Sequence, residues 1–154
     1  MTIWVDADSC PVRIREIILR AAERTGITAV FVANRAIPGV ETAEASLVVV
    51  EKGEGVADRY RLDHAESGDL AITRDIPLAA DLSKKDILVL DDRGGIVDKN
   101  NARQRLSMRN AMTELRSYGI QSETTKPMSK RDIQQFANVF DRQLRRWVNN
   151  KIKN

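Results

Sequence analysis

Short apolar stretches alternate with amphipathic ones over the first two thirds of the chain. The short stretches have the length of strands, whereas the longer ones repeat apolar residues three and four positions apart, as helices do. The expected strands are Thr2–Asp6, Thr28–Ala33, Ser46–Val50, Leu70–Thr73 and Asp86–Leu90. The expected helices among them are Val12–Thr25, about 56–66, and Ile76–Leu82. Gly94-Gly95 predicts a turn, with a small hairpin as one form of it.

Two long helices are expected in the last third of the chain. In the first, 101–118, one face carries Met108, Ala111, Met112, Leu115 and Tyr118, with Arg105, Arg109 and Arg116 beside it. Ser129 is the expected N-cap of the second, with Asp132 three residues later. An apolar stripe then follows at helical spacing: Ile133, Phe136, Ala137, Phe140, Leu144 and Trp147. The stripe indicates a helix packed on the core. Residues 121–127 are expected to form the loop between the two helices.

Alternating strands and helices predict a three-layer α/β fold, with a mostly parallel five-stranded sheet and helices on both faces. The length of 154 residues suits one domain, 1–154, made of an acidic βα half (1–98) and a basic helical half (99–154). Ligands of such sheets bind outside the carboxyl ends of the strands. Residues that follow strands are therefore the first candidates for a site.

Charge divides the chain unevenly. Residues 1–98 hold 12 Lys and Arg against 18 Asp and Glu, a net −6, while residues 99–154 hold 13 against 4, a net +9. This pattern indicates an anionic partner for the second half, and we expect nucleic acid, RNA ahead of DNA. Two solvated helices with basic outer faces would give the same pattern. No apolar run is long enough for a membrane span, no signal peptide is evident, and a single cysteine suits the cytoplasm.

Carboxylates follow three of the expected strands or begin the helix after one. Asp6 and Asp8 end the first strand with side chains on the same side, and Asp75 follows the fourth. Asp58 lies in the first turn of the helix after the third strand. Asp6, Asp58 and Asp75 are the expected catalytic residues. Together with Asp8 they are the expected ligands of Mg²⁺ or Mn²⁺, ions that take carboxylate oxygens and promote phosphodiester hydrolysis. Alternatively, Asp8 and Ser9 cap the next helix.

Other residues complete or limit this interpretation. Thr73 and Asn34 lie at strand ends and are candidates to orient a ligand, and Arg105 and Arg109 are expected to contact phosphates, with Arg116 a weaker candidate. Asp69 precedes its strand, at the opposite edge, and is expected in a turn. His64 is the only histidine and Cys10 the only cysteine, which argues against zinc and against a cysteine–histidine nucleophile. Neither common nucleotide-loop motif occurs.

The sequence motifs resemble those of a known family. They are 3–12 (IWVDADSCPV), 31–34 (FVAN), 57–58 (AD), 68–79 (GDLAITRDIPLA), 105–110 (RLSMRN) and 136–138 (FAN). In this order they look like the YaiI/YqxD family of uncharacterised bacterial proteins, in which Ser9 is commonly alanine. That family is similar to PIN-like domains, many of which are metal-dependent nucleases. The resemblance implies a PIN-like fold and metal-site roles for Asp6, Asp58 and Asp75, with Asp8 as a further candidate.

Two other functions remain open. Val5–Asp8 resembles the first motif of haloacid-dehalogenase-type phosphatases, in which Asp6 would be the nucleophile and Asp8 the general acid. Leu88–Asp92 resembles their late acidic motif, with Thr73 and Lys84 or Lys85 between, although Pro11 starts a helix too early for the usual flap. A nucleic-acid-binding module without catalysis is equally compatible with the basic half. Oligomeric state is not predicted.

Overall fold

A six-stranded sheet forms the middle layer of the protein. The computed structural model describes residues 1–119 and 127–153. The strands are β1 (Thr2–Asp6), β2 (Thr28–Ala33), β3 (Ala45–Val49), β4 (Leu70–Ile72), β5 (Leu88–Leu90) and β6 (Ile96–Val97). Their order is β3-β2-β1-β4-β5-β6, and every pairing is parallel except β5 with β6. The central position of β1 places Asp6 between the ends of β2 and β4.

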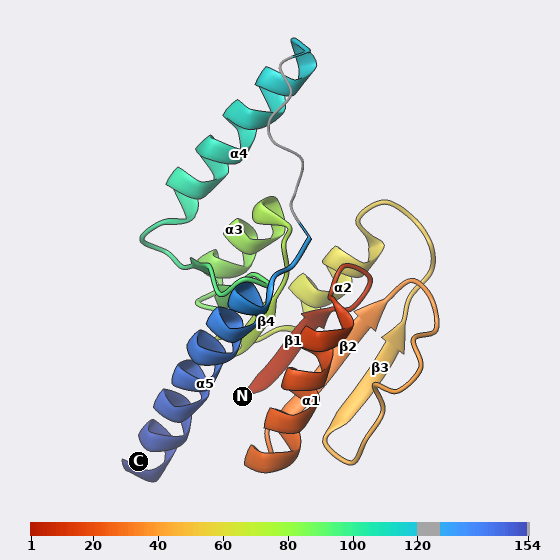
Figure 1. Ribbon diagram of the computed structural model, residues 1–154, viewed down its shortest axis with the longest axis vertical. Coiled ribbons are helices and arrows are strands. Elements are labelled where there is room, and N and C mark those ends of the chain that lie inside the picture. Colours follow the sequence, from red (N-terminus) through yellow and green to blue (C-terminus); the bar gives the residue numbers. More distant parts are fainter. Residues whose placement is uncertain (120–126, 154) are drawn as a thin grey trace.

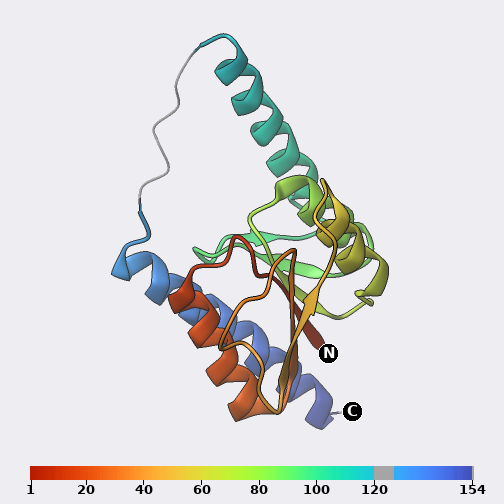
Figure 2. The same ribbon diagram turned by 90° about the vertical axis from the view of Figure 1, so that its right-hand side faces the viewer.

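Helices cover both faces of this sheet (Figures 1 and 2). Helices α1 (Val12–Thr25) and α5 (Lys130–Lys153) pack on one face and contact each other. Helices α2 (Val56–His64) and α3 (Ile76–Lys84) pack on the other. Helix α4 (Ala102–Ser117) starts against α3 and then extends away from the sheet. The expected three-layer α/β architecture is confirmed and is consistent with a PIN-like fold.

The two cores follow from alternation along the strands. Ile3 and Val5 of β1 are fully buried on the α1/α5 side, whereas Trp4 packs on the α2/α3 side. Helix α5 buries Phe136, Phe140 and Leu144, as its stripe predicted, with the rings of Phe136 and Phe140 stacked 5.3 Å apart. At the end of α1, Gly26 takes the left-handed conformation (φ 73°) and its N–H caps the carbonyl of Ala22.

Three details differ from the sequence-based expectation. The sheet has a sixth strand, because the turn at Gly94-Gly95 does close a small hairpin between β5 and β6. Strand β5 begins at Leu88, since Asp86 has a positive φ of 67° and belongs to the preceding turn. Asp69 is at the opposite edge, as expected, but it is more than a turn residue: its buried carboxylate accepts hydrogen bonds from the backbone N–H groups of Thr2 and Glu66 and from the Trp4 indole.

The expected loop at 121–127 lies outside the described residues except for Pro127. Within residues 1–119 and 127–153, no helix combines the length and the apolar character that crossing a membrane requires.

Candidate functional site

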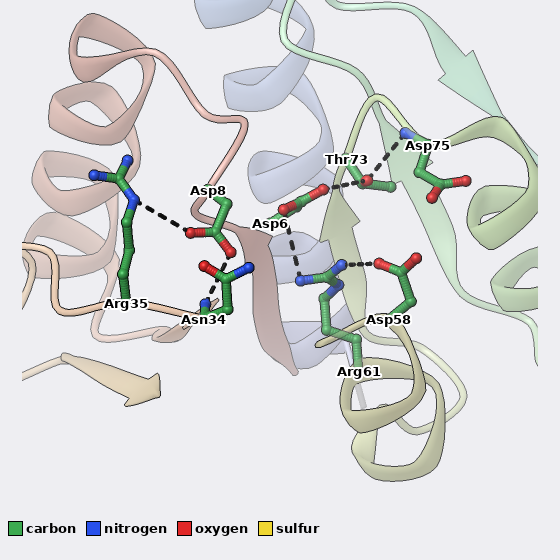
Figure 3. A network of polar contacts seen from close by, with 8 residues as sticks. All are labelled: Asp6, Asp8, Asn34, Arg35, Asp58, Arg61, Thr73 and Asp75. Atoms are coloured by element: carbon green, nitrogen blue, oxygen red, sulfur yellow. Dashed lines mark hydrogen bonds and ion pairs between the residues drawn. The ribbon is translucent and has the colours of Figure 1, made fainter. Parts of the chain in front are cut away.

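Four of the predicted residues meet at the carboxyl edge of the sheet (Figure 3). Asp6 is the last residue of β1, and Thr73 directly follows β4. Asp75 is the N-cap of α3, and Asp58 lies in the first turn of α2. The parallel pairing of β1 with β4 brings the first two together, and the helices on the α2/α3 face bring the other two to the same place.

Thr73 connects two of these acids. Its hydroxyl donates a hydrogen bond to Asp6 Oδ2 and accepts one from the backbone N–H of Asp75, each at 3.1 Å. Asp75 Oδ1 in turn accepts the N–H of Leu78 at 3.0 Å, an ordinary helix N-cap. Thr73 therefore fixes the geometry of the acids, and its expected role in orienting a ligand stays a prediction.

An arginine that the sequence analysis did not select lies among the acids. The side chain of Arg61, on α2, is only 1% exposed. One guanidinium nitrogen, Nη2, hydrogen-bonds to Asp58 Oδ1, and the other, Nη1, lies 3.7 Å from Asp6 Oδ1. Nε and Nη1 have no hydrogen-bond partner. The spacing of Asp58 and Arg61, three residues apart on one helix, was visible in the sequence. No apolar pattern in α2 indicated that this arginine would be buried.

Asp58 and Asp75 form a close carboxyl pair. Partial burial raises the pKa of Asp58 above its usual range, and the nearby guanidinium of Arg61 opposes this rise. The negative charge of Asp75 and a hydrogen bond between the two carboxyl groups raise the pKa of Asp58 further, and Asp6 adds to the effect.

A cavity of about 290 Å³ opens beside this pair, between α2 and α3. Asp58 and Asp75 are in its wall, together with two further acids, Asp63 and Asp81, and one base, Arg59. An acidic wall of this kind favours a cation, and the cavity leaves room for water around it. The pair is thus accessible from solvent while Arg61, behind it, is not.

Asp8 faces a different direction from the other acids. Its carboxylate accepts the backbone N–H of Asn34 at 2.9 Å and lies 3.5 Å from Nε of Arg35. These contacts tie the loop after β1 to the loop after β2 (Figure 3). The structure therefore does not bring Asp8 to the Asp58–Asp75 pair. Asn34 is exposed beside it and contacts Asp8 through its backbone.

The acids after β5 are paired with arginines. Asp92 is almost fully buried, with Nε of Arg74 at 3.6 Å, and burial raises its pKa while Arg74 opposes the rise. Asp91 lies 3.7 Å from Nη2 of Arg105, at the start of α4. Arg105 is therefore held at the carboxyl edge, whereas Arg109, one turn farther along α4, is exposed.

The donor set fits a divalent ion at one place. Among the residues that the structure describes, no group of three or more His, Cys, Asp or Glu side chains is arranged to hold a metal. Mg²⁺, however, commonly takes only one or two carboxylates and keeps its waters. Asp58 and Asp75 supply that number of carboxylates beside the cavity between α2 and α3. Asp6 faces Arg61 and Thr73 instead.

His64 and Cys10 have the structural roles expected of them. His64 is exposed and stacks on Tyr60 with ring centroids 3.9 Å apart. Cys10 packs against the α1/α5 core, and burial raises the pKa of its thiol to about 12.

These features define a three-layer α/β protein with a polar site at the carboxyl edge of its sheet. The chain belongs to the YaiI/YqxD family: the family model described as "Uncharacterized BCR, YaiI/YqxD family" matches residues 4–146. It is 48% identical over 153 residues to a "UPF0178 protein" of Myxococcus xanthus (strain DK1622), covering 99% of this chain and 100% of that one. A "UPF0178 protein" of Treponema pallidum (strain Nichols) is 46% identical, covering 93% of this chain and 81% of that one. No solved structure matches the chain significantly.

Proposed function

We propose that this protein is a divalent-metal-dependent nuclease that hydrolyses phosphodiesters of RNA or DNA. The observation that carries the proposal is the Asp58–Asp75 carboxyl pair, which faces a cavity at the carboxyl edge of the sheet. Such a pair suits Mg²⁺ or Mn²⁺. When bound, the ion would activate water and offset the charge that develops on the phosphate.

The residues of the chain have separate tasks in this proposal. Asp58 and Asp75 hold the ion, and Thr73 keeps the backbone of Asp75 and the carboxylate of Asp6 in place. Asp6 holds Arg61 in turn. The ordered hydrogen bonds mean that little rearrangement is needed when substrate arrives, which is how a fixed polar site lowers a barrier.

Helix α4 supplies the expected contacts to the polynucleotide backbone. Arg105 lies at the carboxyl edge through its pairing with Asp91, and Arg109 follows one turn later with its side chain in solvent. A strand bound along α4 would therefore lead toward the acids at the edge of the sheet. Phosphate contacts of this kind hold a substrate without reading its sequence.

The two lysines that the phosphatase alternative proposed contact other groups than Asp6. That chemistry would require Lys84 or Lys85 near Asp6. Lys85 Nζ instead contacts the carbonyl oxygens of Leu62 and Ala65, and Lys84 pairs with Asp81 on the surface. These positions favour the nuclease over the phosphatase.

The test is a cleavage assay on a short labelled single-stranded RNA and on the DNA of the same sequence. We expect cleavage with Mg²⁺ or Mn²⁺, none with a chelator, and a loss of roughly 100-fold or more in Asp58→Asn and Asp75→Asn, the scale of losing one transition-state contact. Asp141→Asn, the same change on α5 near the end of α1, is the control and should keep the wild-type rate. Equal cleavage by Asp75→Asn would contradict the proposal, and salt-sensitive binding without cleavage would indicate a non-catalytic nucleic-acid-binding module.

A further inference from the structure

The position of Arg61 limits how many ions the site can hold. A guanidinium that is 1% exposed is costly to bury unless carboxylates compensate its charge. Here Asp58 contacts one end of the guanidinium and Asp6 lies 3.7 Å from the other. Figure 3 shows the group between these two acids, on the side of Asp58 that faces away from Asp75. The gap between Asp6 and Asp58 thus already contains a positive charge.

This gap is where a second cation would otherwise be needed. Two carboxylates in a partly buried site repel each other unless a cation or a proton lies between them. Catalytic sites with two metals place the ions roughly 3.5–4 Å apart, bridged by shared carboxylates. Asp58 is the shared residue here: Oδ1 accepts from Arg61, and the carboxyl group also reaches Asp75.

We propose that the site binds a single divalent ion, at Asp58 and Asp75, and that Arg61 permanently fills the second cation position between Asp58 and Asp6. Arg61 is then a positioning residue: it orients Asp58 toward the cavity and keeps Asp6 from acting as a metal ligand. The inference rests on the proposed function, because it assigns the residues of the same site.

The unpartnered nitrogens of Arg61 agree with this role. Nε and Nη1 are buried and have no hydrogen-bond partner, so Nη1 interacts with Asp6 by charge across 3.7 Å. A purely structural arginine would be expected to satisfy these donors, since each buried donor without a partner costs free energy. We infer that the guanidinium of Arg61 acts mainly through its charge on Asp6 and Asp58.

The test is a calorimetric titration of Mn²⁺ into the full chain. Wild type should bind one equivalent. Asp75→Asn removes a direct ligand and should weaken binding beyond the roughly 10–100-fold that outer contacts cost, whereas Asp6→Asn changes only an outer contact and should weaken binding by no more than that range. Binding of two equivalents, or equal weakening by Asp6→Asn and Asp75→Asn, would overturn the inference.

Variants of Arg61 examine the same point directly. Arg61→Met leaves Asp6 and Asp58 without their cation and should bind a second equivalent of Mn²⁺, with circular dichroism confirming the fold. Arg61→Lys restores a positive charge and should return the stoichiometry to one, which a merely structural role would not predict. Arg13→Met, at an exposed position on α1 away from the cavity, is the matched control and should also bind one equivalent. If Arg61→Met does not fold, the comparison of Asp6→Asn with Asp75→Asn decides.

The two proposals fail in different ways. Two bound equivalents together with metal-dependent cleavage would leave the nuclease proposal standing and remove only the role of Arg61. Absence of any Mn²⁺ binding to wild type would remove both.

Discussion

Three polar side chains near the carboxyl edge, those of Arg61, Asp92 and Cys10, are largely buried beside different charged neighbours. The charge of the buried Arg61 is compensated by Asp58 and Asp6, which lie on either side of it. Asp92 is nearly as buried, and burial raises its pKa, while the half-exposed Arg74 and the neighbouring Arg93 oppose the rise. Burial also raises the pKa of the Cys10 thiol, and Arg15 opposes the rise.

The first prediction concerns Cys10. Burial raises the pKa of its thiol to about 12, with Arg15 opposing the rise, so the reactive thiolate is scarce at neutral pH. Folded protein at pH 8 should therefore react with iodoacetamide much more slowly than protein unfolded in urea, as followed by mass spectrometry. Rapid labelling of the folded protein would contradict the buried position of this residue.

At the scale of single residues, the sequence predicted which side chains lie at the carboxyl edge where the rule for parallel strands applied. Asp6, Thr73 and Asp75 were selected as candidates because side chains that follow parallel strands gather at one edge of the sheet. Asp58 was selected because it lies in the first turn of the helix after the third strand. The rule did not separate Asp8 from them, since its orientation depends on Asn34 and Arg35 in another loop. Arg61 was missed because a charged residue on a helix with few apolar neighbours is expected in solvent.

At the scale of elements, α4 and α5 show how similar patterns lead to different environments. Both carry apolar residues at helical spacing and many arginines. The stripe of α5 packs against α1 and the sheet, whereas Met108 and Leu115 on α4 are 62% and 42% exposed. Periodicity predicted that both helices exist. It could not predict that α4 contacts α3 only near its start, because that depends on the position of the β5–β6 hairpin before it.

The second prediction concerns the start of α5. Asp132 accepts the backbone N–H of Ser129, and this hydrogen bond together with the Ser129 hydroxyl lowers its pKa. A lowered pKa in the folded state stabilises the protein above the ordinary aspartate pKa of about 4, and this contribution is lost as the pH falls through the folded value. Asp132→Asn should therefore unfold at lower urea than wild type at pH 7, and the difference should shrink on acidification.

A companion variant checks the cause of this pH dependence. Ser129→Ala removes the hydroxyl but keeps the backbone N–H that Asp132 accepts. Ser129→Ala should also unfold at lower urea than wild type, by a smaller difference than Asp132→Asn. A difference for Asp132→Asn that does not change between pH 7 and pH 3 would show that the carboxylate charge is not what stabilises the helix start.

At the scale of the whole molecule, the acidic and basic halves of the sequence form different parts of the structure. The acidic half builds the sheet and the cavity between α2 and α3, while α4 and α5 carry most of the net +9 of residues 99–154. Helix α4 lies beside the carboxyl edge through the pairing of Arg105 with Asp91. Helix α4 extends away from the sheet, whereas α5 packs on it. A polyanion that follows the basic surface of α4 therefore approaches the acids at one end of the helix.

The third prediction is that nucleic-acid binding depends on salt through α4. Arg105→Ala with Arg109→Ala should weaken binding to single-stranded RNA and reduce the slope of log affinity against log salt by at most about 1.4, since each phosphate contact on a single strand contributes about 0.7. Fluorescence anisotropy across a salt series measures this. Arg20→Ala, on α1 at the α1–α5 groove, is the control and should leave the slope unchanged. If the affinity of wild type does not change with salt concentration, α4 does not bind the nucleic acid through its phosphates.

The central claim is that Asp58 and Asp75 hold a divalent ion, and a crystal grown or soaked in Mn²⁺ tests it most directly. Anomalous difference density locates manganese without assumptions about activity. We expect one peak at the carboxyl edge, between the carboxylates of Asp58 and Asp75, with the guanidinium of Arg61 still between Asp58 and Asp6. Absence of density at this pair in a well-occupied crystal, or a peak at Asp8 or Asp92 in its place, would contradict the account.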